Sequence, residues 1–384
     1  MDKFAEIALA YEAEQRAPGR ALAYGDVPGT FDAITTQWLT AILCGATPGA
    51  QVSAFSMGDP DNGSSNRRRL FLEYNDFGHA AGLPATIFCK AAESLGSRVM
   101  LGAAGTSLAE VNFFNKVRSR LNIEAPEAYY VAFNPQTYAY IVVLKDIGDS
   151  VTFCDESTDI TWPRAVSMVS LLASFHARFY ASPELGTESL PYRTWPDFWN
   201  NMLKNSKGWA EACAHAMDIS EHVVPPRLYK RRGQIWAATW NSVARHNALS
   251  KTLTHCDVHL KNWYLAPGNR MGLADWQILT VGHWSRDLIY ALCTGLDIEN
   301  RRAWLPKLLR LYVDKMREFG VLDISFEEAL LNCRQQLFTT LAFWTITLVP
   351  APGMPPMQPE KTTYKFIERL TAAIDDMDAL DSFE

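Results

Sequence analysis

The chain has 384 residues, of which 48% are hydrophobic and 20% charged, and its formal net charge at pH 7 is −6. This length is enough for two domains, or for two lobes of unequal size that each have a core. The mild negative charge argues against nucleic acid as the main partner, because the longest basic runs are the triplets at 67–69 and 230–232.

The cysteines and the N-terminal segment indicate a cytoplasmic protein. An odd number of cysteines without a CxxC pair predicts reduced thiols instead of a disulfide framework. The seven are Cys44, Cys89, Cys154, Cys213, Cys256, Cys293 and Cys333. The N-terminal segment has acidic residues and no long apolar core, so a signal peptide is not expected. No run of about 18 apolar residues is present, so no membrane span is expected either.

The first part of the chain is predicted to form an antiparallel sheet with helices. Residues 1–50 have a helical pattern, whose clearest amphipathic piece runs from Phe31 to Leu43. Alternating apolar and polar residues predict strands at 51–57, 67–75, 85–92, 128–134 and 138–147. Ser107 and Glu110 have the spacing of a capping box, which predicts a helix over 107–121.

Beyond residue 150 the pattern changes to helices. Strong periodicity predicts them at 162–181, 195–218, 224–249, 302–319, 325–348 and 360–380. A hairpin is the only strand-like interruption that we expect there. The chain is therefore predicted to be an α+β protein with two lobes: a small antiparallel-sheet lobe with a helical extension over residues 1–145, and a larger, mostly helical lobe over 146–384.

The predicted hairpin lies within the stretch from Thr254 to Gln277. Its arms are the apolar segments 263–266 and 271–274, joined by a turn that contains Pro, Gly and Asn. If the arms pair antiparallel with Ala266 opposite Met271, then Asn262 lies opposite Asp275. Directly paired residues are about 4.5–5.5 Å apart at Cα. Two oxygen-bearing side chains at that spacing can share one hard cation such as Mg²⁺.

The same stretch contains the pattern HxDxxxxN. It is met by His255, Asp257 and Asn262, and Asp275 follows at the far end of the hairpin in "LADWQ". This combination resembles the catalytic loop of the aminoglycoside and choline phosphotransferase superfamily, which has the protein-kinase-like fold. Within that superfamily the chain resembles most the ecdysteroid-kinase-like branch.

Further matches to this superfamily come from other parts of the chain. Lys90 in "ATIFCKAA" resembles the lysine of the third strand, and Glu110 resembles the helix glutamate that pairs with it. The stretch "YIVVLKDIGD" (140–149) resembles the hinge, and "LLASFHARFY" (171–180) resembles a helix that precedes the catalytic loop. Asp287 in "WSRDLIYAL" resembles the aspartate that supports this loop.

The resemblance implies an ATP-dependent kinase that uses Mg²⁺ and phosphorylates a hydroxyl group of a small molecule. Such catalysis depends mainly on positioning and on charge neutralisation. Asp257 would orient the acceptor hydroxyl and accept its proton, while Asn262 and Asp275 would hold Mg²⁺. Lys90, fixed by Glu110, would hold the nucleotide phosphates. The backbone of the small-residue loop would cover those phosphates with Gly63, Ser64 and Ser65. His255 and Asp287 would support the loop.

Three other interpretations stay open at this stage. Cys256 stands where the family most often has glycine, and it adds a side chain next to the expected catalytic aspartate. A non-catalytic nucleotide-binding relative is therefore one alternative. A zinc metallohydrolase with His255, Asp257 and His259 as ligands is a second. The third is a thiol nucleophile at Cys256, although His255, as its neighbour in a strand, would point to the opposite face.

The acceptor is predicted from the aromatic residues of the helical part. These residues are Trp195, Phe198, Trp199, Trp209, Trp236, Trp240, Trp284, Phe338, Phe343 and Trp344. Aromatic walls suit an apolar or aromatic alcohol, so a hydrophobic hydroxylated metabolite is expected. Aminoglycosides, hydroxyacyl thioesters and choline-like amines stay open, since choline is bound by an aromatic cage.

Overall fold

The computed structural model describes residues 3–205, 207–350 and 357–384. It divides into two compact units. Unit 1 comprises residues 1–120 and 126–149, and unit 2 comprises residues 121–125 and 150–384. The antiparallel sheet in unit 1 and the helices of unit 2 confirm the predicted α+β class. The domain boundary expected between residues 145 and 146 stays a prediction.

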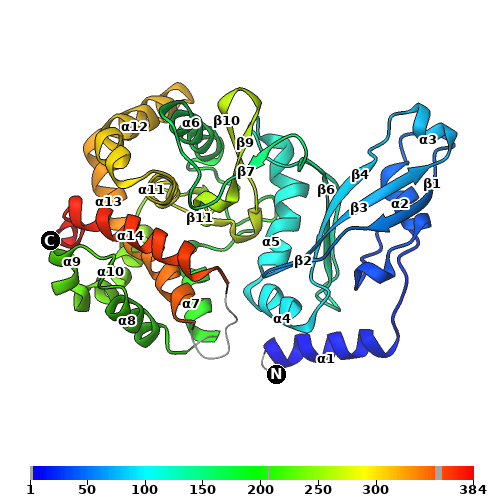
Figure 1. The fold of residues 1–384 in the computed structure, drawn as a ribbon, viewed down its shortest axis with the longest axis horizontal. Helices are drawn as coiled ribbons and strands as arrows, with labels where there is room; N and C mark the ends of the chain where they lie inside the picture. Colours follow the sequence, from blue (N-terminus) through cyan, green and yellow to red (C-terminus); the bar gives the residue numbers. More distant parts are fainter. Residues whose placement is uncertain (1–2, 206, 351–356) are drawn as a thin grey trace. The chain divides into compact units, whose positions relative to one another are not determined.

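Unit 1 is built around one antiparallel sheet. Its helices are α1 (Lys3–Arg16), α2 (Thr36–Leu43), α3 (Asp76–Ala80), α4 (Leu95–Ala104) and α5 (Thr106–Asn112). Its strands are β1 (Val52–Met57), β2 (Asp61–Asn62), β3 (Asn66–Tyr74), β4 (Thr86–Ala91), β5 (Ala128–Phe133) and β6 (Tyr140–Lys145). The strand order is β1-β3-β4-β6-β5, with β2 paired to β3. Figure 1 labels β1, β2, β3, β4 and β6 of this sheet. All the strands predicted in this region are confirmed.

The alternation of side chains along β4 explains where Lys90 points. Ile87, Cys89 and Ala91 belong to a buried apolar cluster on one face of the sheet. Lys90 lies between the last two, so its side chain projects to the opposite face. Glu110 on α5 faces it from that side, and the two side chains meet there.

Two helix predictions in unit 1 are wrong in detail. The segment from Phe31 is only a 3₁₀ turn, and α2 begins at Thr36, where the Thr35 side chain accepts the N–H of Trp38. The helix predicted over 107–121 is α5, followed by a π-helical turn and then a 3₁₀ turn. The N-cap of α5 is Gly105 and not Ser107, so the capping box is absent there, and the preceding α4 was not predicted.

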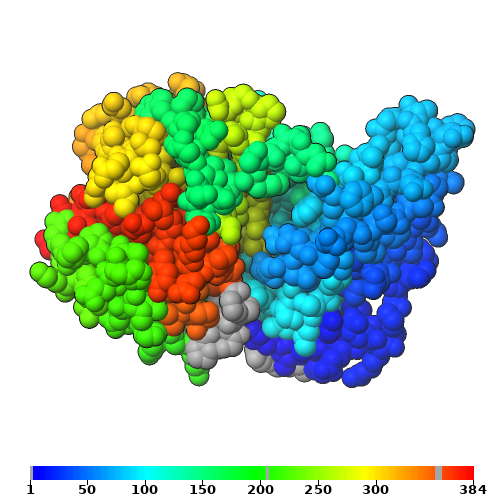
Figure 2. Space-filling model, viewed as in Figure 1, coloured from blue at the N-terminus to red at the C-terminus, as the bar shows by residue number. Residues whose placement is uncertain are grey.

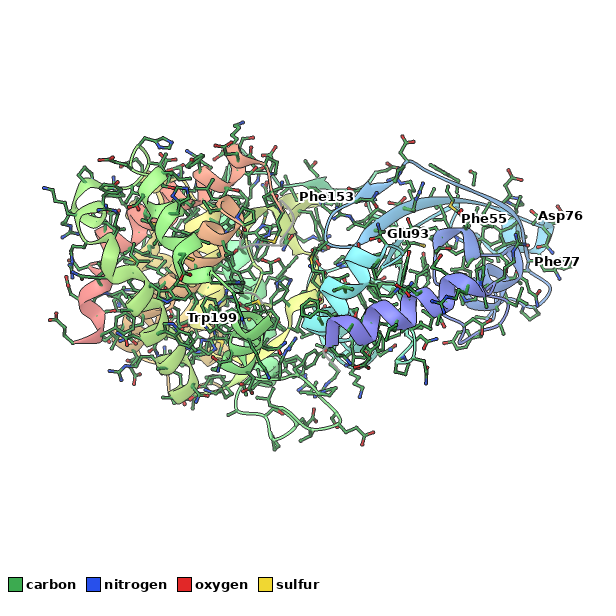
Figure 3. All side chains as sticks on the ribbon, turned by 90° about the horizontal axis from the view of Figure 1, so that it is seen from below. Phe55, Asp76, Phe77, Glu93, Phe153 and Trp199 are labelled. Atoms are coloured by element: carbon green, nitrogen blue, oxygen red, sulfur yellow. The ribbon has the colours of Figure 1, made fainter. Side chains whose placement is uncertain are left out.

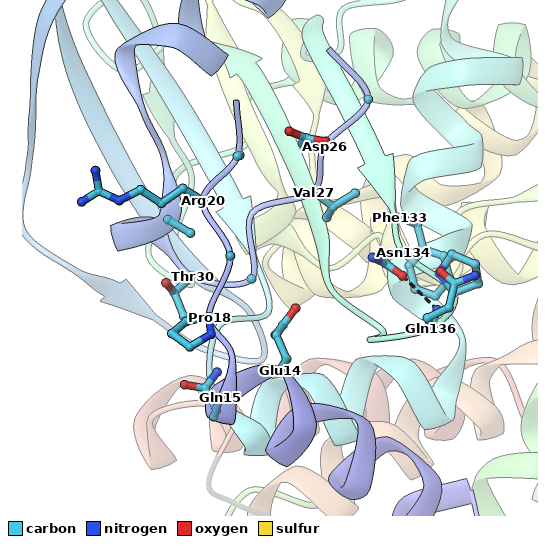
Figure 4. A pocket seen from close by; sticks show the side chains of 16 residues that line it. Glu14, Gln15, Pro18, Arg20, Asp26, Val27, Thr30, Phe133, Asn134 and Gln136 are labelled. Atoms are coloured by element: carbon cyan, nitrogen blue, oxygen red, sulfur yellow. Dashed lines mark hydrogen bonds between the residues drawn. The ribbon is translucent and has the colours of Figure 1, made fainter. Parts of the chain in front are cut away.

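A buried arginine connects the segment after α1 to α4 and to the turn between β5 and β6. Arg98 on α4 pairs with Glu14 and donates to the carbonyl of Gly29 at 2.7 Å and to that of Thr137 at 3.2 Å. A cavity of about 480 Å³ opens between this segment and the turn that joins β5 to β6 (Figure 4). The helical stretch predicted over residues 1–50 is thus interrupted between α1 and α2, because residues 17–30 form no helix.

Unit 2 is mostly helical. Its helices are α6 (Trp162–Phe179), α7 (Trp195–Asn205), α8 (Trp209–Ile219), α9 (Pro226–Lys230), α10 (Ile235–Ala248), α11 (Ser285–Gly295), α12 (Ile298–Glu318), α13 (Phe326–Leu348) and α14 (Glu360–Asp376). Its strands are β7 (Thr152–Phe153), β8 (Thr252–Thr254), β9 (Trp263–Ala266), β10 (Arg270–Leu273) and β11 (Thr280–Gly282). α12 lies beside α6 (Figure 1), and the red α14 segment lies next to the green helices in Figure 2.

The strands of unit 2 form two small sheets. The predicted hairpin is present as β9 and β10, and β7 extends it on the other side of β9. β8 and β11 pair with each other and were not predicted, because three buried residues are too short for an alternating pattern. These two strands flank the segment that carries the HxDxxxxN pattern.

The predicted aromatic residues of unit 2 are mainly core. Trp195, Trp199 and Trp209 are almost completely buried in one apolar cluster, which we call the aromatic cluster and which also contains Cys256. Trp199 lies among the helices of this unit (Figure 3). Trp236 and Phe343 are half-buried members at its border. Within the described residues, no helix combines the length and apolar character needed to cross a membrane.

Candidate active site

His255 opens the candidate catalytic loop directly after β8. The Nδ1 atom of this fully buried residue accepts the backbone N–H of Asp257 at 3.2 Å, so Nε2 carries the proton and donates to the carbonyl of Ala274 at 3.0 Å. Burial lowers the pKa of His255, and the neutral ring fits both bonds. The histidine therefore joins the start of the loop to the end of the hairpin, and its two ring nitrogens are engaged in doing so.

Asp287 holds the backbone of the loop from α11. Its two carboxylate oxygens accept the N–H of His255 at 2.6 Å and that of Cys256 at 2.9 Å. Burial alone would raise the pKa of Asp287, but a hydrogen bond from His176 and nearby positive charge bring this pKa below its ordinary value. The carboxylate thus stays ionised in the core, and the buried His176 is its partner.

Cys256 adopts the left-handed backbone conformation, with φ of +66°. Glycine reaches this conformation without cost, whereas other residues lose about 1–2 kcal/mol. The thiol lies in the interior, where its sulfur is 3.2 Å from Oγ1 of Thr254 and 2.9 Å from Oγ1 of Thr280. The side chain therefore points into the core of unit 2.

Asp257 and Asn262 are joined directly. The side-chain amide of Asn262 donates to the backbone carbonyl of Asp257 at 2.7 Å and to its Oδ2 atom at 3.1 Å. His259 approaches the other oxygen, with 3.6 Å between Nε2 and Oδ1. The aspartate is partly exposed, while His259 is buried against the ring of Trp344. One carboxylate is thus held between an amide and an imidazole and is open to solvent on its remaining side.

The register of the hairpin differs from the prediction by one residue. Ala266 pairs with Arg270 and Trp263 with Leu273, because the turn contains only Pro267, Gly268 and Asn269. Gly268 and Asn269 both have positive φ, as such a short turn requires. Asn262 therefore lies opposite Ala274, whose N–H donates to the Asn262 carbonyl at 2.8 Å, and not opposite Asp275.

The left-handed backbone of Asp275 itself directs this residue back towards the loop. Its φ and ψ are +60° and +63°, so the chain turns sharply where β10 has ended. Burial lowers the pKa of both His255 and His259. The carboxylates of Asp257 and Asp275 oppose this shift at both imidazoles. The two carboxylates thus lie within electrostatic reach of the same two rings, although the predicted register of the hairpin was wrong by one residue.

The donor atoms of the loop fit a hard cation. Both hydrogens of the Asn262 amide are directed to Asp257, so its Oδ1 atom is turned to the opposite side. The half-buried carboxylate of Asp275 supplies the second oxygen ligand. Amide and carboxylate oxygens are the ligand types that Mg²⁺ prefers. The roles of these two residues as metal ligands stay a prediction.

The zinc and thiol alternatives are not supported by the geometry. His255 uses both ring nitrogens within the protein and so has no lone pair left for zinc. In the described ranges, no group of three or more His, Cys, Asp or Glu residues is placed to hold a metal ion. Burial raises the pKa of Cys256 to about 12, which leaves little of the nucleophilic thiolate.

Unit 1 contains the predicted phosphate-binding pair. Nζ of Lys90 is 2.9 Å from Oε1 of Glu110, and both side chains are buried. A buried lysine needs such a partner, because an unpaired charge in the interior is costly. Lys90 and Glu110 are therefore brought together as predicted, within unit 1, while Asp257, Asn262 and Asp275 belong to unit 2.

The small-residue loop is a tight hairpin between β2 and β3. The N–H of Gly63 donates to the carbonyl of Ser65 at 2.9 Å, and exposure decreases from Gly63 through Ser64 to the buried Ser65. Asn66 anchors its base: Oδ1 accepts the N–H of Glu93 at 2.9 Å, and Nδ2 donates to Asn62. This anchor was missed in the sequence, where Asn66 was counted as one more polar loop residue.

The fold and the loop together define a class of protein, that of kinases which phosphorylate hydroxyl groups. The antiparallel sheet with a buried Lys–Glu pair and the helical unit with an Asp–Asn catalytic loop both fit this class. Residues 163–321, which include the whole loop, match the model of a family described as "Phosphotransferase enzyme family". This match supports the predicted superfamily and the predicted class of enzyme.

Solved structures similar to this chain include three small-molecule phosphotransferases. Wild-type aminoglycoside 2'-phosphotransferase-IIIa, in complex with GDP, is 11% identical, with a TM-score of 0.49 over 88% of this chain and 99% of that one. Ethanolamine kinase of Plasmodium vivax is 10% identical, with a TM-score of 0.48 over 85% and 83%. Choline kinase LicA of Streptococcus pneumoniae is 12% identical, with a TM-score of 0.46 over 84% and 94%. A search of curated proteins by sequence found no significant match.

Proposed function

We propose that this protein is an ATP-dependent kinase that transfers the γ-phosphoryl group to a hydroxyl of a hydrophobic or aromatic small molecule. The observation that carries the proposal is the loop from His255 to Asp275. It holds a partly exposed carboxylate, bonds it to an amide and returns a second carboxylate to the same place. Phosphoryl transfer needs this combination of a positioned acceptor and concentrated charge neutralisation.

Asp257 is the group that acts on the acceptor in this proposal. One of its oxygens is held by Asn262, and the other lies near Nε2 of His259, so the carboxylate has a fixed orientation. It orients the acceptor hydroxyl and receives its proton as the oxygen–phosphorus bond forms. Asp257 is therefore the catalytic residue, and His255 and Asp287 support the backbone that carries it.

Asn262 and Asp275 are the residues that would hold Mg²⁺. When bound, the ion neutralises negative charge on the nucleotide phosphates. The hydrogen bonds of Asn262 to Asp257 keep its amide oxygen directed away from the carboxylate that receives the proton. The left-handed backbone of Asp275 brings its carboxylate out of the hairpin ladder and towards the loop. The two roles, proton acceptance and metal binding, thus fall on separate side chains.

Lys90 and the small-residue loop are assigned to the nucleotide. Glu110 keeps the buried lysine charged and fixed in direction, so that it can bind the α- and β-phosphates of ATP. The backbone N–H groups around Gly63, Ser64 and Ser65 are proposed to cover these phosphates. The Asn66 anchor supports this role, because it holds the base of the loop to the segment that follows β4.

The acceptor class is proposed from the border of the aromatic cluster. Cys256, next to the catalytic aspartate in the sequence, packs in this cluster, and Trp236 and Phe343 are its half-buried members. An apolar or aromatic alcohol would bury its skeleton on such side chains and present its hydroxyl to Asp257. Aminoglycosides, choline and hydroxyacyl thioesters are the competing acceptors.

The seven buried, unpaired cysteines support a reducing, cytoplasmic location.

An acceptor screen tests the proposal. ADP release is measured with Mg²⁺ and ATP over steroids, phenols, terpenoid alcohols, aminoglycosides, choline and a hydroxyacyl thioester, in the wild-type protein and in Asp257→Asn. We expect turnover with a hydrophobic alcohol that the variant loses. Turnover restricted to aminoglycosides or choline would overturn the acceptor class but keep the kinase. ATP binding without turnover on any acceptor would instead favour the non-catalytic relative.

A further inference from the structure

Arg286 precedes Asp287 on α11 and contacts the catalytic loop from the same helix. Its side chain is completely buried, and Nη1 donates to the backbone carbonyl of Cys256 at 2.6 Å. This carbonyl belongs to the peptide group whose N–H is that of Asp257. The same N–H donates to Nδ1 of His255. The peptide that leads into the catalytic aspartate is thus held at its oxygen by Arg286 and at its nitrogen by His255.

This peptide needs to be held because of the conformation of Cys256. A residue with a Cβ atom loses about 1–2 kcal/mol in the left-handed region. Asp287 accepts the N–H of Cys256, and Arg286 donates to the Cys256 carbonyl, so both backbone groups of this residue are hydrogen-bonded to α11. An ordinary, right-handed conformation at Cys256 would break both bonds and rotate the following peptide. The direction of the Asp257 side chain would then change.

Arg286 also contacts the aromatic cluster. Its Cζ atom lies 3.9 Å from the centroid of the Trp195 ring and 5.3 Å from that of Phe343. Its Nε donates to the Thr339 hydroxyl at 3.3 Å. This buried cation therefore contacts a carbonyl, a hydroxyl and ring faces, and it also lies within electrostatic reach of Asp287. A guanidinium suits such a site, since it stacks on rings while it donates in its own plane.

We propose that Arg286 is a positioning residue that fixes the direction of Asp257 by clamping the Cys256–Asp257 peptide against the aromatic cluster. The proposal rests on the proposed kinase function, because the group being positioned is the proposed catalytic residue. A loss of the clamp misplaces the carboxylate relative to the acceptor hydroxyl while the binding of ATP is unchanged. Glycine at position 256 reduces the need for the clamp, since it has no Cβ atom that resists the left-handed conformation.

The test compares Arg286→Met and Arg286→Lys with Cys256→Gly and with the double variant Arg286→Met/Cys256→Gly. Arg369→Met is the matched control, because Arg369 is also a buried arginine of unit 2 that donates to backbone carbonyls. With the acceptor found in the screen, we expect R286M to lower kcat by about 10–100-fold, as for an ångström-scale misplacement, and to leave the KM for ATP within about twofold. The double variant should regain most of the lost kcat.

A second measurement does not depend on turnover. The alkylation of Cys256 by iodoacetamide in the native protein is followed by peptide mass spectrometry. The thiol is buried between two threonine hydroxyls, so the wild-type protein should react slowly. R286M should raise this rate at least about tenfold, and R369M should not. If the wild-type protein shows no turnover with any acceptor, the kinase proposal fails while this rate still decides whether Arg286 clamps the loop.

Three results would overturn the role of Arg286. The first is a Cys256 alkylation rate that is the same in R286M and in the wild-type protein. The second is an equal effect of R369M, which would indicate general loosening of unit 2. The third is a kcat of the double variant that stays as low as that of R286M, because glycine at 256 could then not substitute for the clamp.

Discussion

The side-chain amide of Asn262 donates to both the backbone carbonyl and the carboxylate of Asp257, at 2.7 and 3.1 Å. The proposed proton acceptor and the proposed metal ligand are therefore one rigid pair within a six-residue stretch of the loop. The pair separates the two tasks, since the amide nitrogen faces the aspartate and the amide oxygen faces away. A substitution that removes proton acceptance and one that removes metal binding should therefore give different kinetic signatures.

The first prediction concerns Asp257. Asp257→Asn keeps the size of the side chain but cannot accept the acceptor's proton, so kcat should fall by about 10²–10⁴-fold. The Kd for ATP should change little, because the nucleotide contacts are on other residues. The measurement is ADP release with the screened acceptor, together with ATP titration. Asp314→Asn, on an exposed surface pair, is the control and should retain full activity.

The second prediction concerns Asp275. Asp275→Asn tolerates the same left-handed backbone but removes one negative charge, so half-maximal activity should require at least about tenfold more Mg²⁺. Asp378→Asn is the matched control, because Asp378 also has positive φ and lies near the C-terminus. An unchanged Mg²⁺ requirement in Asp275→Asn would remove this residue from the metal site. The readout is turnover as a function of Mg²⁺ at fixed ATP.

The third prediction concerns the Lys90–Glu110 pair. Because both side chains are buried, Lys90→Met leaves an uncompensated carboxylate and should lower the free energy of unfolding by about 3–5 kcal/mol. Lys90→Met/Glu110→Leu should cost less than the sum of the two single variants. The exposed pair of Lys315 and Glu318 serves as the control, and Lys315→Met should cost no more than about 1 kcal/mol. Chemical denaturation measures all four variants, and additive costs would show that the pair is not coupled.

The fourth prediction concerns the anchor of the small-residue loop. Asn66→Ala removes the acceptor for the N–H of Glu93 and should raise the KM for ATP about fivefold, as expected for the loss of one hydrogen bond worth about 1 kcal/mol. Asn66→Asp retains that acceptor and should stay close to the wild-type value. The kcat should be nearly the same in both variants. A KM that is unaffected by Asn66→Ala would separate this loop from the nucleotide.

The fifth prediction concerns acid stability. Burial lowers the pKa of His246 to about 3, against an ordinary value of 6.5, and the Nε2 atom of the neutral ring accepts the N–H of His283. The unfolded chain thus binds a proton below about pH 6.5 that the folded chain does not. His246 therefore stabilises the fold above that pH, and this contribution decreases as the pH falls towards 3, by up to about 1.4 kcal/mol per pH unit.

The role of His246 is measured by urea denaturation between pH 4 and pH 8. His246→Gln should reduce the slope of stability against pH below 6.5, whereas the exposed control His79→Gln should keep the wild-type slope. An unaltered slope in His246→Gln would assign the acid sensitivity to other groups. The buried His255 and His283, whose pKa values burial also lowers, are the next candidates.

Sequence reasoning was most successful where the information is local. The HxDxxxxN segment and its following aspartate lie within 21 residues, and they were selected as candidate site residues without the fold. The five longer strands of unit 1 were also predicted, and in β3 buried residues alternate with exposed ones along the second half of the strand. Lys90 and Glu110 were paired by resemblance, and the alternation along β4 explains why they meet.

What the tertiary structure decided depends on contacts between distant segments. The register of the hairpin follows from two left-handed residues in its turn, and the direction of Asp275 follows from a third. β8 and β11 are too short to have a pattern and exist because they pair with each other. Arg286 has no motif, and its partners come from segments that lie 30 and 53 residues away along the chain. The sequence alone determined which groups are proposed to do the chemistry, since residue type and short spacing decide that. Their orientation was decided only by packing, because the backbone strain at Cys256 and Asp275 is tolerated only where the surrounding core holds it.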